Sequence, residues 1–266
     1  METIVCIKQI LDPDLPPAKF TIDAQKSRVI PPEGIPPVIN PYDALAVEAA
    51  LRIKEKKGGR ITIVTLGGKT AEDMVRKALA MGADEGRIIS APDLEGLDSF
   101  ATAYLLSLAI RKVGKFDLVL CGRQAADWDF GAVGSVLAEF LGVPVVTRAK
   151  EISALDGKVT VETVNTAGSE TLEVELPALV TVSNELGKAR IPSGWGIITA
   201  AKKEIPTWSL QDIGVDPSST GKLSARNKLL KLSAPSLERK CELVKGDVPA
   251  EVAEKLAQKI MEKKVL

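Results

Sequence analysis

The residues best suited to chemistry lie in the stretch KFDLVLCGRQAADWDFGAVGSVLAEFLGVPVV, from Lys115 to Val146. A buried apolar strand runs there into a loop with two aspartates and a tryptophan, and then into a glycine-spaced helix. Gly131 and Gly134 fall in the first turn of that helix. Small residues at such a place let a phosphate reach free backbone N–H groups and the positive end of the helix dipole. The pattern is typical of a nucleotide-binding turn.

The aspartates of this loop need another role, because carboxylates repel phosphate. Asp129 fits the N-cap of the helix, and Asp127 fits an acceptor for ribose or adenine donors. The alternative interpretation is structural, with Asp129 as a simple cap and Trp128 as a packing residue. The residues alone favour nucleotide binding over that alternative.

The composition excludes most other chemistry. The 266 residues include no histidine, which rules out a Ser-His-Asp triad, a Cys-His pair and any histidine-ligated metal. Cys6, Cys121 and Cys241 form no CxxC pair, and the first two lie in apolar runs that favour buried thiols in a reducing compartment. We therefore expect no catalytic side chain and no metal site, and any redox chemistry must come from a cofactor.

Charge and hydropathy limit the partners. Lys+Arg and Asp+Glu both number 35, and a net charge of zero argues against a nucleic-acid partner. The chain opens as METIVCIKQI, which reads as a strand and not as a signal peptide. No apolar run approaches the ~20 residues that a membrane helix needs. We expect a soluble cytoplasmic protein without membrane insertion, with a removed organellar presequence as the open alternative.

The elements that must position the loop alternate between strands and helices. Buried β-rich runs occupy residues 3–8, 60–66, 86–90 and 116–122, and helical patterns occupy 41–58, 69–83, 98–114 and 131–142. Asn40 fits the N-cap of the first helix, Pro41 its first position and Gly58 its end, while Asp98 caps the third. This alternation predicts an α/β fold with a doubly wound, mostly parallel sheet.

The rhythm changes after residue 150. Residues 151–183 alternate at period two around an Asp156-Gly157 turn, which predicts an antiparallel hairpin edge. Residues 204–246 read as an extended arm with too few large apolar residues for its own core, and 247–264 as a terminal amphipathic helix. We expect two parts, an α/β domain of residues 1–203 and a C-terminal arm and helix of residues 204–266.

In an open α/β sheet, ligands bind beyond the carboxyl ends of the strands. Four turns are predicted to converge there: after Lys8, before Asn40, after Leu66 and after Cys121. The GGKT run at 67–70 is not a phosphate loop of the Walker type, because Ile63 stands where that pattern needs a glycine.

Six segments together resemble one family. VCIKQ, VINPYDALAVEAALRIKEK, ALAMGADEG, DLVLCGRQAADWDFGAVG, ELPALVTVS and AKKEI, in this order and spacing, are similar to the β subunit of electron transfer flavoproteins, the group that includes FixA. The resemblance covers nearly all of residues 1–205. It implies an adenine-nucleotide-binding α/β domain that forms an obligate heterodimer with an α subunit, which carries FAD.

The resemblance also implies the site residues. The expected nucleotide contacts are Cys6, Asn40, Pro41, Tyr42, Asp43, Leu66, Gly122, Arg123, Gln124, Ala125, Ala126, Asp127, Trp128, Asp129, Phe130, Gly131, Ala132, Val133 and Gly134. These positions fall on the turns that the sheet argument selects.

The nucleotide itself has two candidates. One branch of the family holds AMP here, and an electron-bifurcating branch holds a second FAD that takes a hydride from NADH. VCIKQ and CGRQA resemble the bifurcating branch, whereas DWDFGAVG lacks its threonine-alanine-glutamine run. We favour FAD, with NAD as a hydride donor, and keep AMP as the alternative.

The family's partner dehydrogenases dock on a loop that corresponds to about 184–200, where the chain ends its α/β domain. The expected anchoring leucine is replaced by Gly194, with Trp195 beside it. The resemblance therefore implies docking of an acyl-CoA or other flavin-dependent dehydrogenase through Trp195. Four basic residues are expected to steer an acidic partner surface: Lys188, Arg190, Lys202 and Lys203.

Two other classes of protein share the predicted architecture. An adenylating enzyme of the ATP-pyrophosphatase type would need a Ser/Gly-rich loop after the first strand, where KQILDPD stands. A nucleotide-sensing domain would need neither the long arm nor the loop at 184–196.

Overall fold

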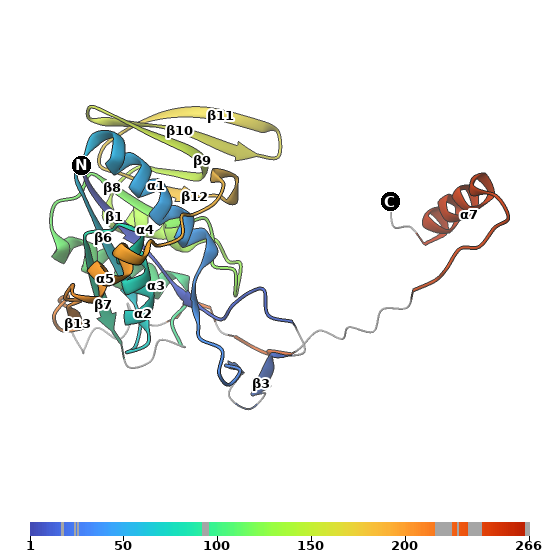
Figure 1. Ribbon diagram of the computed structural model, residues 1–266, viewed down its shortest axis with the longest axis horizontal. Helices are drawn as coiled ribbons and strands as arrows, with labels where there is room; N and C mark the ends of the chain where they lie inside the picture. The colour runs from blue at the N-terminus through green and yellow to red at the C-terminus, as the bar shows by residue number, and fades with distance from the viewer. Residues whose placement is uncertain are drawn as a thin grey trace.

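A nine-stranded sheet forms the centre of the molecule (Figure 1), with the strand order β11-β10-β9-β12-β8-β1-β6-β7-β13. The computed structural model describes residues 1–16, 19–23, 25, 27–91, 96–215, 225–227, 229–233 and 241–263. The sheet strands are β1 Glu2–Cys6, β6 Arg60–Leu66, β7 Glu85–Ser90, β8 Leu118–Gly122, β9 Val145–Leu155, β10 Lys158–Asn165, β11 Gly168–Glu175, β12 Ala178–Val182 and β13 Thr207–Ser209. Neighbouring strands are parallel throughout the run β9-β12-β8-β1-β6-β7-β13.

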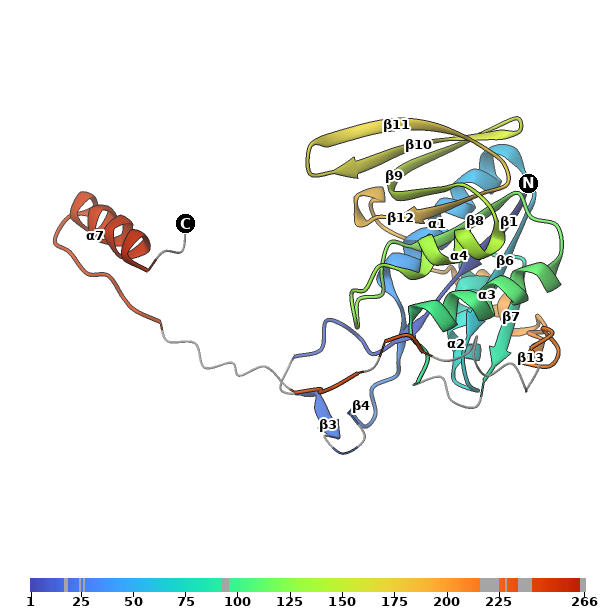
Figure 2. The same cartoon turned by 180° about the vertical axis from the view of Figure 1, so that it is seen from behind.

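Helices cover both faces of this sheet. They are α1 Pro41–Lys57, α2 Ala71–Met81, α3 Ser99–Val113, α4 Val133–Leu141 and α5 Gly194–Ala201. A 3-10 turn, η2, lies at Asn184–Leu186, and a further helix, α7 Pro249–Glu262, does not cover the sheet. α1, α2 and α5 lie in front of the sheet in Figure 1, and α3 and α4 lie on the opposite face in Figure 2. The predicted doubly wound α/β fold is confirmed.

The central strands are apolar on both sides because both faces are covered. The sheet has one apolar core on each face. In β1, Val5 packs into the core on the side of α1, while Ile4 packs into the core on the side of α3, here called the second core. The predicted helix signals also hold. α1 begins at Pro41 and ends before Gly58, whose φ is 70°. The side chain of Asp98 caps α3 by accepting a hydrogen bond from the N–H of Ala101 at 2.9 Å.

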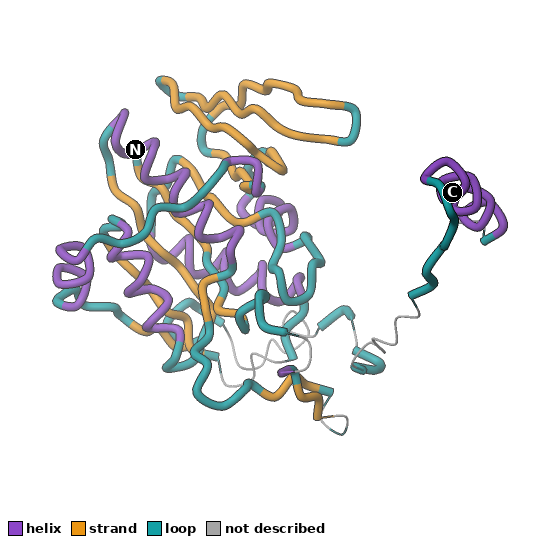
Figure 3. Tube along the Cα trace, turned by 45° about the vertical axis from the view of Figure 1, so that its right-hand side comes forward, coloured by secondary structure: helices purple, strands orange, loops and turns teal. Residues whose placement is uncertain are grey.

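The predicted hairpin forms the far edge of the sheet, seen at the top of Figure 3. β9 and β10 pair antiparallel around the turn at Asp156 and Gly157, and β11 pairs antiparallel with β10. The antiparallel edge predicted from period-two alternation is therefore confirmed.

Three segments differ from the prediction. The proline-rich segment before α1 contains two small antiparallel sheets, β2 Gln9–Ile10 with β5 Val38–Ile39 and β3 Thr21–Asp23 with β4 Arg28–Ile30. The helix predicted for residues 131–142 is α4, which begins at Val133 and not at Gly131, whose φ of 61° is left-handed. Residues 194–201 form α5, so Trp195 lies on a helix and not in a loop.

The predicted arm begins with an element of the sheet. β13 pairs in parallel with β7, and Ile213 and Val215 are each only 5% exposed in the core beneath α3. The start of the predicted arm therefore packs on the sheet that it follows. The arm positions 216–224, 228 and 234–240 lie outside the described residues.

The predicted terminal helix is present as α7, which lies apart from the sheet in Figures 1 and 2 and buries no residue. In the described part of the chain, every helix is too short or too polar to cross a membrane.

The packing of the first arm residues yields a stability test. Ile213→Ala should lower the free energy of unfolding by about 2–4 kcal/mol, because it leaves a cavity beneath α3. Leu243→Ala is the control, since Leu243 is 77% exposed and its loss should change stability by less than about 0.5 kcal/mol. Denaturant titration measures both, and equal effects would contradict the burial of residue 213.

Candidate functional site

The carboxyl ends of three adjacent strands, β8, β1 and β6, meet beside the start of α1. Asp43, in the first turn of α1, links two of these strands, β8 and β1. Its carboxylate accepts hydrogen bonds from the backbone N–H of Lys8 at 2.7 Å and of Gly122 at 2.9 Å. One buried side chain therefore joins the ends of β1 and β8 to the helix between them in the sequence.

The surroundings of Asp43 are tight and dry. A Cβ on Gly122 would lie 2.5 Å from Oδ1 of Asp43 and 2.6 Å from Cβ of Tyr42, so the glycine is required for close approach. Burial raises the pKa of Asp43 to about 7, while hydrogen bonds from Asn40, Lys8 and Gly122 act in the opposite direction.

Asn40 holds the loop after β8. It occupies the predicted N-cap position, but its side chain makes no cap hydrogen bond. Instead its amide donates to the carbonyl of Gln124 at 2.8 Å and accepts from the N–H of Ala126 at 3.1 Å. Two contacts from one buried amide fix the loop against α1, and they bring the two segments of the predicted site together.

Lys8 and Asp127 form an ion pair across the same edge. The Nζ of Lys8 lies 2.6 and 2.9 Å from the two carboxylate oxygens of Asp127. The pair neutralises a charge that would repel a phosphate. Sequence reasoning missed Lys8 as a site residue, although its position directly after the first strand was the signal that could have identified it.

Asp129 does not cap the helix that follows, and this prediction is wrong. It has a left-handed φ of 54° and accepts a hydrogen bond from Nε2 of Gln124 at 2.6 Å. Ala132 is the residue before α4, and no side chain caps that helix. The first N–H groups of α4 therefore have no side-chain acceptor, and a bound anion could take that place.

The two glycines near α4 have different roles. Gly131 needs its left-handed φ of 61°, and a Cβ there would lie 3.4 Å from the carbonyl oxygen of Arg123. A Cβ on Gly134 would lie 2.5 Å from Cγ2 of Thr181. Gly134 thus permits α4 to pack on β12, and the close approach to a ligand predicted for both glycines stays a prediction.

Aromatic and basic side chains surround the loop. Trp128 and Phe130 stack with ring centroids 6.4 Å apart and are 43% and 73% exposed, so Trp128 is not a core residue. The guanidinium of Arg123 lies 5.0 Å from the ring centroid of Tyr42 and donates from Nη1 to Oγ of Ser183 at 3.3 Å. Its Nε is buried without a hydrogen-bond partner among the described residues.

Cys6 and Leu66 direct their side chains into the second core. A hydrogen bond with Cys6, together with burial, raises the pKa of the Cys121 thiol well above its ordinary value. A ligand can therefore meet Cys6 only through its backbone. Pro41, Ala125, Ala126, Ala132 and Val133 have no polar side-chain atom and can likewise contribute only backbone or apolar contact.

A second feature lies on α5. Ile191, Trp195, Ile197 and Ile198, here called the α5 patch, are 90%, 77%, 56% and 54% exposed. Two of the four basic residues expected to steer a partner are held within the chain. Arg190 binds Glu48 and Glu55, and Nζ of Lys203 donates to the carbonyl of Ala83 at 2.7 Å.

Comparison with known proteins identifies the chain's relatives. A family model described as "Electron transfer flavoprotein domain" matches residues 29–213. Over the full length of both chains, the protein is 39% identical to "Caffeyl-CoA reductase-Etf complex subunit CarD" of Acetobacterium woodii and 38% identical to "Electron transfer flavoprotein subunit beta" of Thermoanaerobacterium thermosaccharolyticum. It is 34% identical to "Protein FixA" of Azorhizobium caulinodans, over 89% of this chain and 85% of the relative.

The fold agrees with the sequence resemblance, and the family match runs from within β4 to the residues after β13, so it covers every strand of the nine-stranded sheet except β1. The chain belongs to the electron transfer flavoprotein family, among its beta subunits and FixA proteins.

Proposed function

We propose that the protein is the β subunit of a heterodimeric electron transfer flavoprotein and binds an adenine nucleotide at the carboxyl ends of β8, β1 and β6. The observation that carries the proposal is the uncapped start of α4 next to the left-handed Gly131. Free N–H groups at that start would receive the phosphates, while Lys8 compensates the charge of Asp127, one of the two aspartates of the loop.

We favour FAD as the nucleotide, with AMP as the second candidate. FAD in this position would supply the capacity to accept a hydride from NADH and pass electrons on singly. The chain's own residues bind and orient it: Asn40 holds the loop, and Trp128 and Phe130 offer flat apolar surfaces for a ring. AMP is favoured by the absence of the threonine-alanine-glutamine run in DWDFGAVG.

An α subunit is the proposed permanent partner, since several relatives are named as beta subunits. α7 is amphipathic, and it exposes Leu256 and Met261 by 47% and 66%. An amphipathic helix with nothing buried needs a second surface to cover its apolar side. We propose that the arm and α7 pack on the α subunit.

The α5 patch is the proposed docking surface for an acyl-CoA dehydrogenase or another flavin-dependent dehydrogenase. Tryptophan and isoleucine side chains that project from a helix fit an apolar pocket, and tryptophan is prominent among residues that dominate binding energy. Lys188 and Lys202 make no ion pair with the described residues, so they remain available to steer an acidic partner surface.

Counting nucleotides in the purified heterodimer tests the cofactor. Extraction from the co-expressed complex should release two FAD molecules, one of them from this subunit. One FAD and one AMP would reject our preference while leaving the β-subunit assignment intact. A complex without adenine nucleotide in this chain would contradict the proposed site itself.

Loop variants test the placement of the phosphates. Gly131→Val should lose the nucleotide, because a β-branched residue is strained at a left-handed φ and obstructs the approach to α4. Asp127→Ala should weaken binding by only about 1 kcal/mol.

Gly157→Val is the matched control for the Gly131 variant, since Gly157 has a φ of 74° in the distant hairpin turn. It imposes similar strain without touching the site. Nucleotide content after dialysis is the measurement, and full retention by Gly131→Val would mean that the phosphates lie elsewhere.

Trp195→Ala tests the docking surface. The KM for a reduced acyl-CoA dehydrogenase should rise about tenfold or more, because removing such a contact costs ~2 kcal/mol. Flavin content and heterodimer assembly should not change. Leu172→Ala serves as the control, because this residue is 39% exposed on the remote β11. Unchanged kinetics for Trp195→Ala would exclude the α5 patch as the docking surface.

A further inference from the structure

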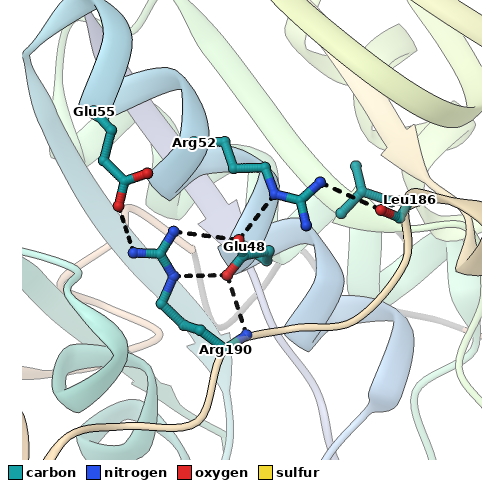
Figure 4. A network of polar contacts seen from close by, with 5 residues as sticks. All are labelled: Glu48, Arg52, Glu55, Leu186 and Arg190. Atoms are coloured by element: carbon teal, nitrogen blue, oxygen red, sulfur yellow. Dashed lines mark hydrogen bonds and ion pairs between the residues drawn. The ribbon is translucent and has the colours of Figure 1, made fainter.

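A carboxylate lies buried in the middle of α1. Glu48 is only 5% exposed, and a charged side chain is rarely buried unless it is paired. Glu48 receives hydrogen bonds from Nε of Arg190 at 2.7 Å and from the backbone N–H of Arg190 at 3.1 Å, and a third from Nε of Arg52 at 2.9 Å. Figure 4 shows this network. Burial acts to raise the pKa of Glu48, but these hydrogen bonds outweigh it and lower the pKa below its ordinary value.

The network fastens the chain that leads to the α5 patch. Arg190 also binds Glu55, which lies about two helical turns after Glu48 in α1. Nη1 of Arg52 donates to the carbonyl of Leu186 at 3.3 Å. Side chains of α1 therefore hold the segment at both of its ends, residues 186 and 190. Because the backbone N–H of Arg190 is itself bound, the contact fixes the backbone as well as the guanidinium.

The next residue is Ile191, the most exposed member of the α5 patch. After it, Ser193 caps α5 by accepting from the N–H of Gly196 at 3.0 Å. A Cβ on Gly196 would lie 2.3 Å from the carbonyl oxygen of Ala80, so α5 packs closely on α2. At the other end of α5, Nη1 of Arg76 donates to the carbonyl of Ala200 at 2.7 Å. The patch thus stands between two fixed points.

We propose that Arg190 is the positioning residue of the docking surface: through Glu48 and Glu55 it holds Ile191 and the start of α5 in the geometry that an apolar pocket of the dehydrogenase receives. This inference rests on the proposed docking function. Arg190 was expected to attract an acidic partner, but its charge is compensated within the chain, so its role lies in geometry.

The ion pair between Arg190 and Glu48 suits such a role, because its carboxylate is buried and receives a bidentate contact, from Nε at 2.7 Å and from Nη2 at 3.2 Å. Replacing it with apolar residues of similar size is often neutral for stability, while the bidentate geometry that selects one backbone conformation is lost. The double variant Glu48→Met with Arg190→Met therefore separates positioning from folding. The matched control is Lys158→Met with Glu173→Met, which removes the 2.6 Å ion pair between β10 and β11.

The experiment uses the complete heterodimer with its α subunit. Amide hydrogen exchange across residues 187–196 measures how well the backbone of the segment is protected from local opening. Steady-state reduction by an acyl-CoA dehydrogenase, itself reduced with its acyl-CoA substrate, gives KM and kcat. Thermal unfolding and nucleotide content show whether the variants remain folded and loaded.

In the Met/Met variant, exchange in this segment should rise at least about tenfold, and KM should rise with little change in kcat. The single variant Arg190→Lys should show smaller rises in exchange and in KM than the Met/Met variant. Lysine keeps the charge but cannot form the bidentate contact. Unchanged exchange, or raised exchange with an unchanged KM, would overturn the proposal.

The Trp195→Ala variant separates the two hypotheses. If Trp195→Ala raises KM and the Met/Met variant does not, the docking surface stands and the positioning role of Arg190 fails. If neither variant raises KM, the docking function itself fails.

Discussion

The carboxylate of Asp43 is the contact on which the candidate site depends. The N–H of Gly122, the last residue of β8, and that of Lys8, two residues beyond β1, lie at the carboxyl ends of these strands and need an acceptor once they are buried. Asp43 accepts both. Because it sits in the first turn of α1, the same contact sets the height and direction of that helix relative to the sheet. Asn40 and the loop after β8 are held beside it by further contacts, from the N–H of Asn40 to the carbonyl of Lys8 and from the N–H of Arg123 to the carbonyl of Val182, each at 2.9 Å.

α1 serves two surfaces that are far apart in the sequence. Its first residues hold the loop from Gln124 to Ala126 through Asn40. Its middle holds the segment before the α5 patch through Glu48. The helix is 17 residues long and buried at every position from 45 to 51, so it joins the proposed nucleotide site to the proposed docking surface as one rigid element.

The chain has no histidine, and its one buried thiol pair has a raised pKa at Cys121 that disfavours a reactive thiolate. Its buried polar groups instead hold backbone segments in place, as Asn40, Asp43 and Glu48 each do. Under the proposed function, the chain would orient a cofactor and present a surface to partners, and the cofactor would supply the redox chemistry.

The sequence by itself determined the alternation of strands and helices, the start of α1 at Pro41, the Asp98 cap and the hairpin turn at Asp156. These follow from contacts between neighbours in the chain. It also determined the family, because six motifs in fixed order are specific. Tertiary structure decided the partners of Asn40 and Asp127, the start of α4, the inclusion of β13 in the sheet and the pairing of Glu48 with Arg190. Asp43 and Lys8 are 35 residues apart, and Glu48 and Arg190 are 142 apart. Each polar side chain had several possible acceptors or donors within local reach, and only the packing of distant segments determined which of them it met.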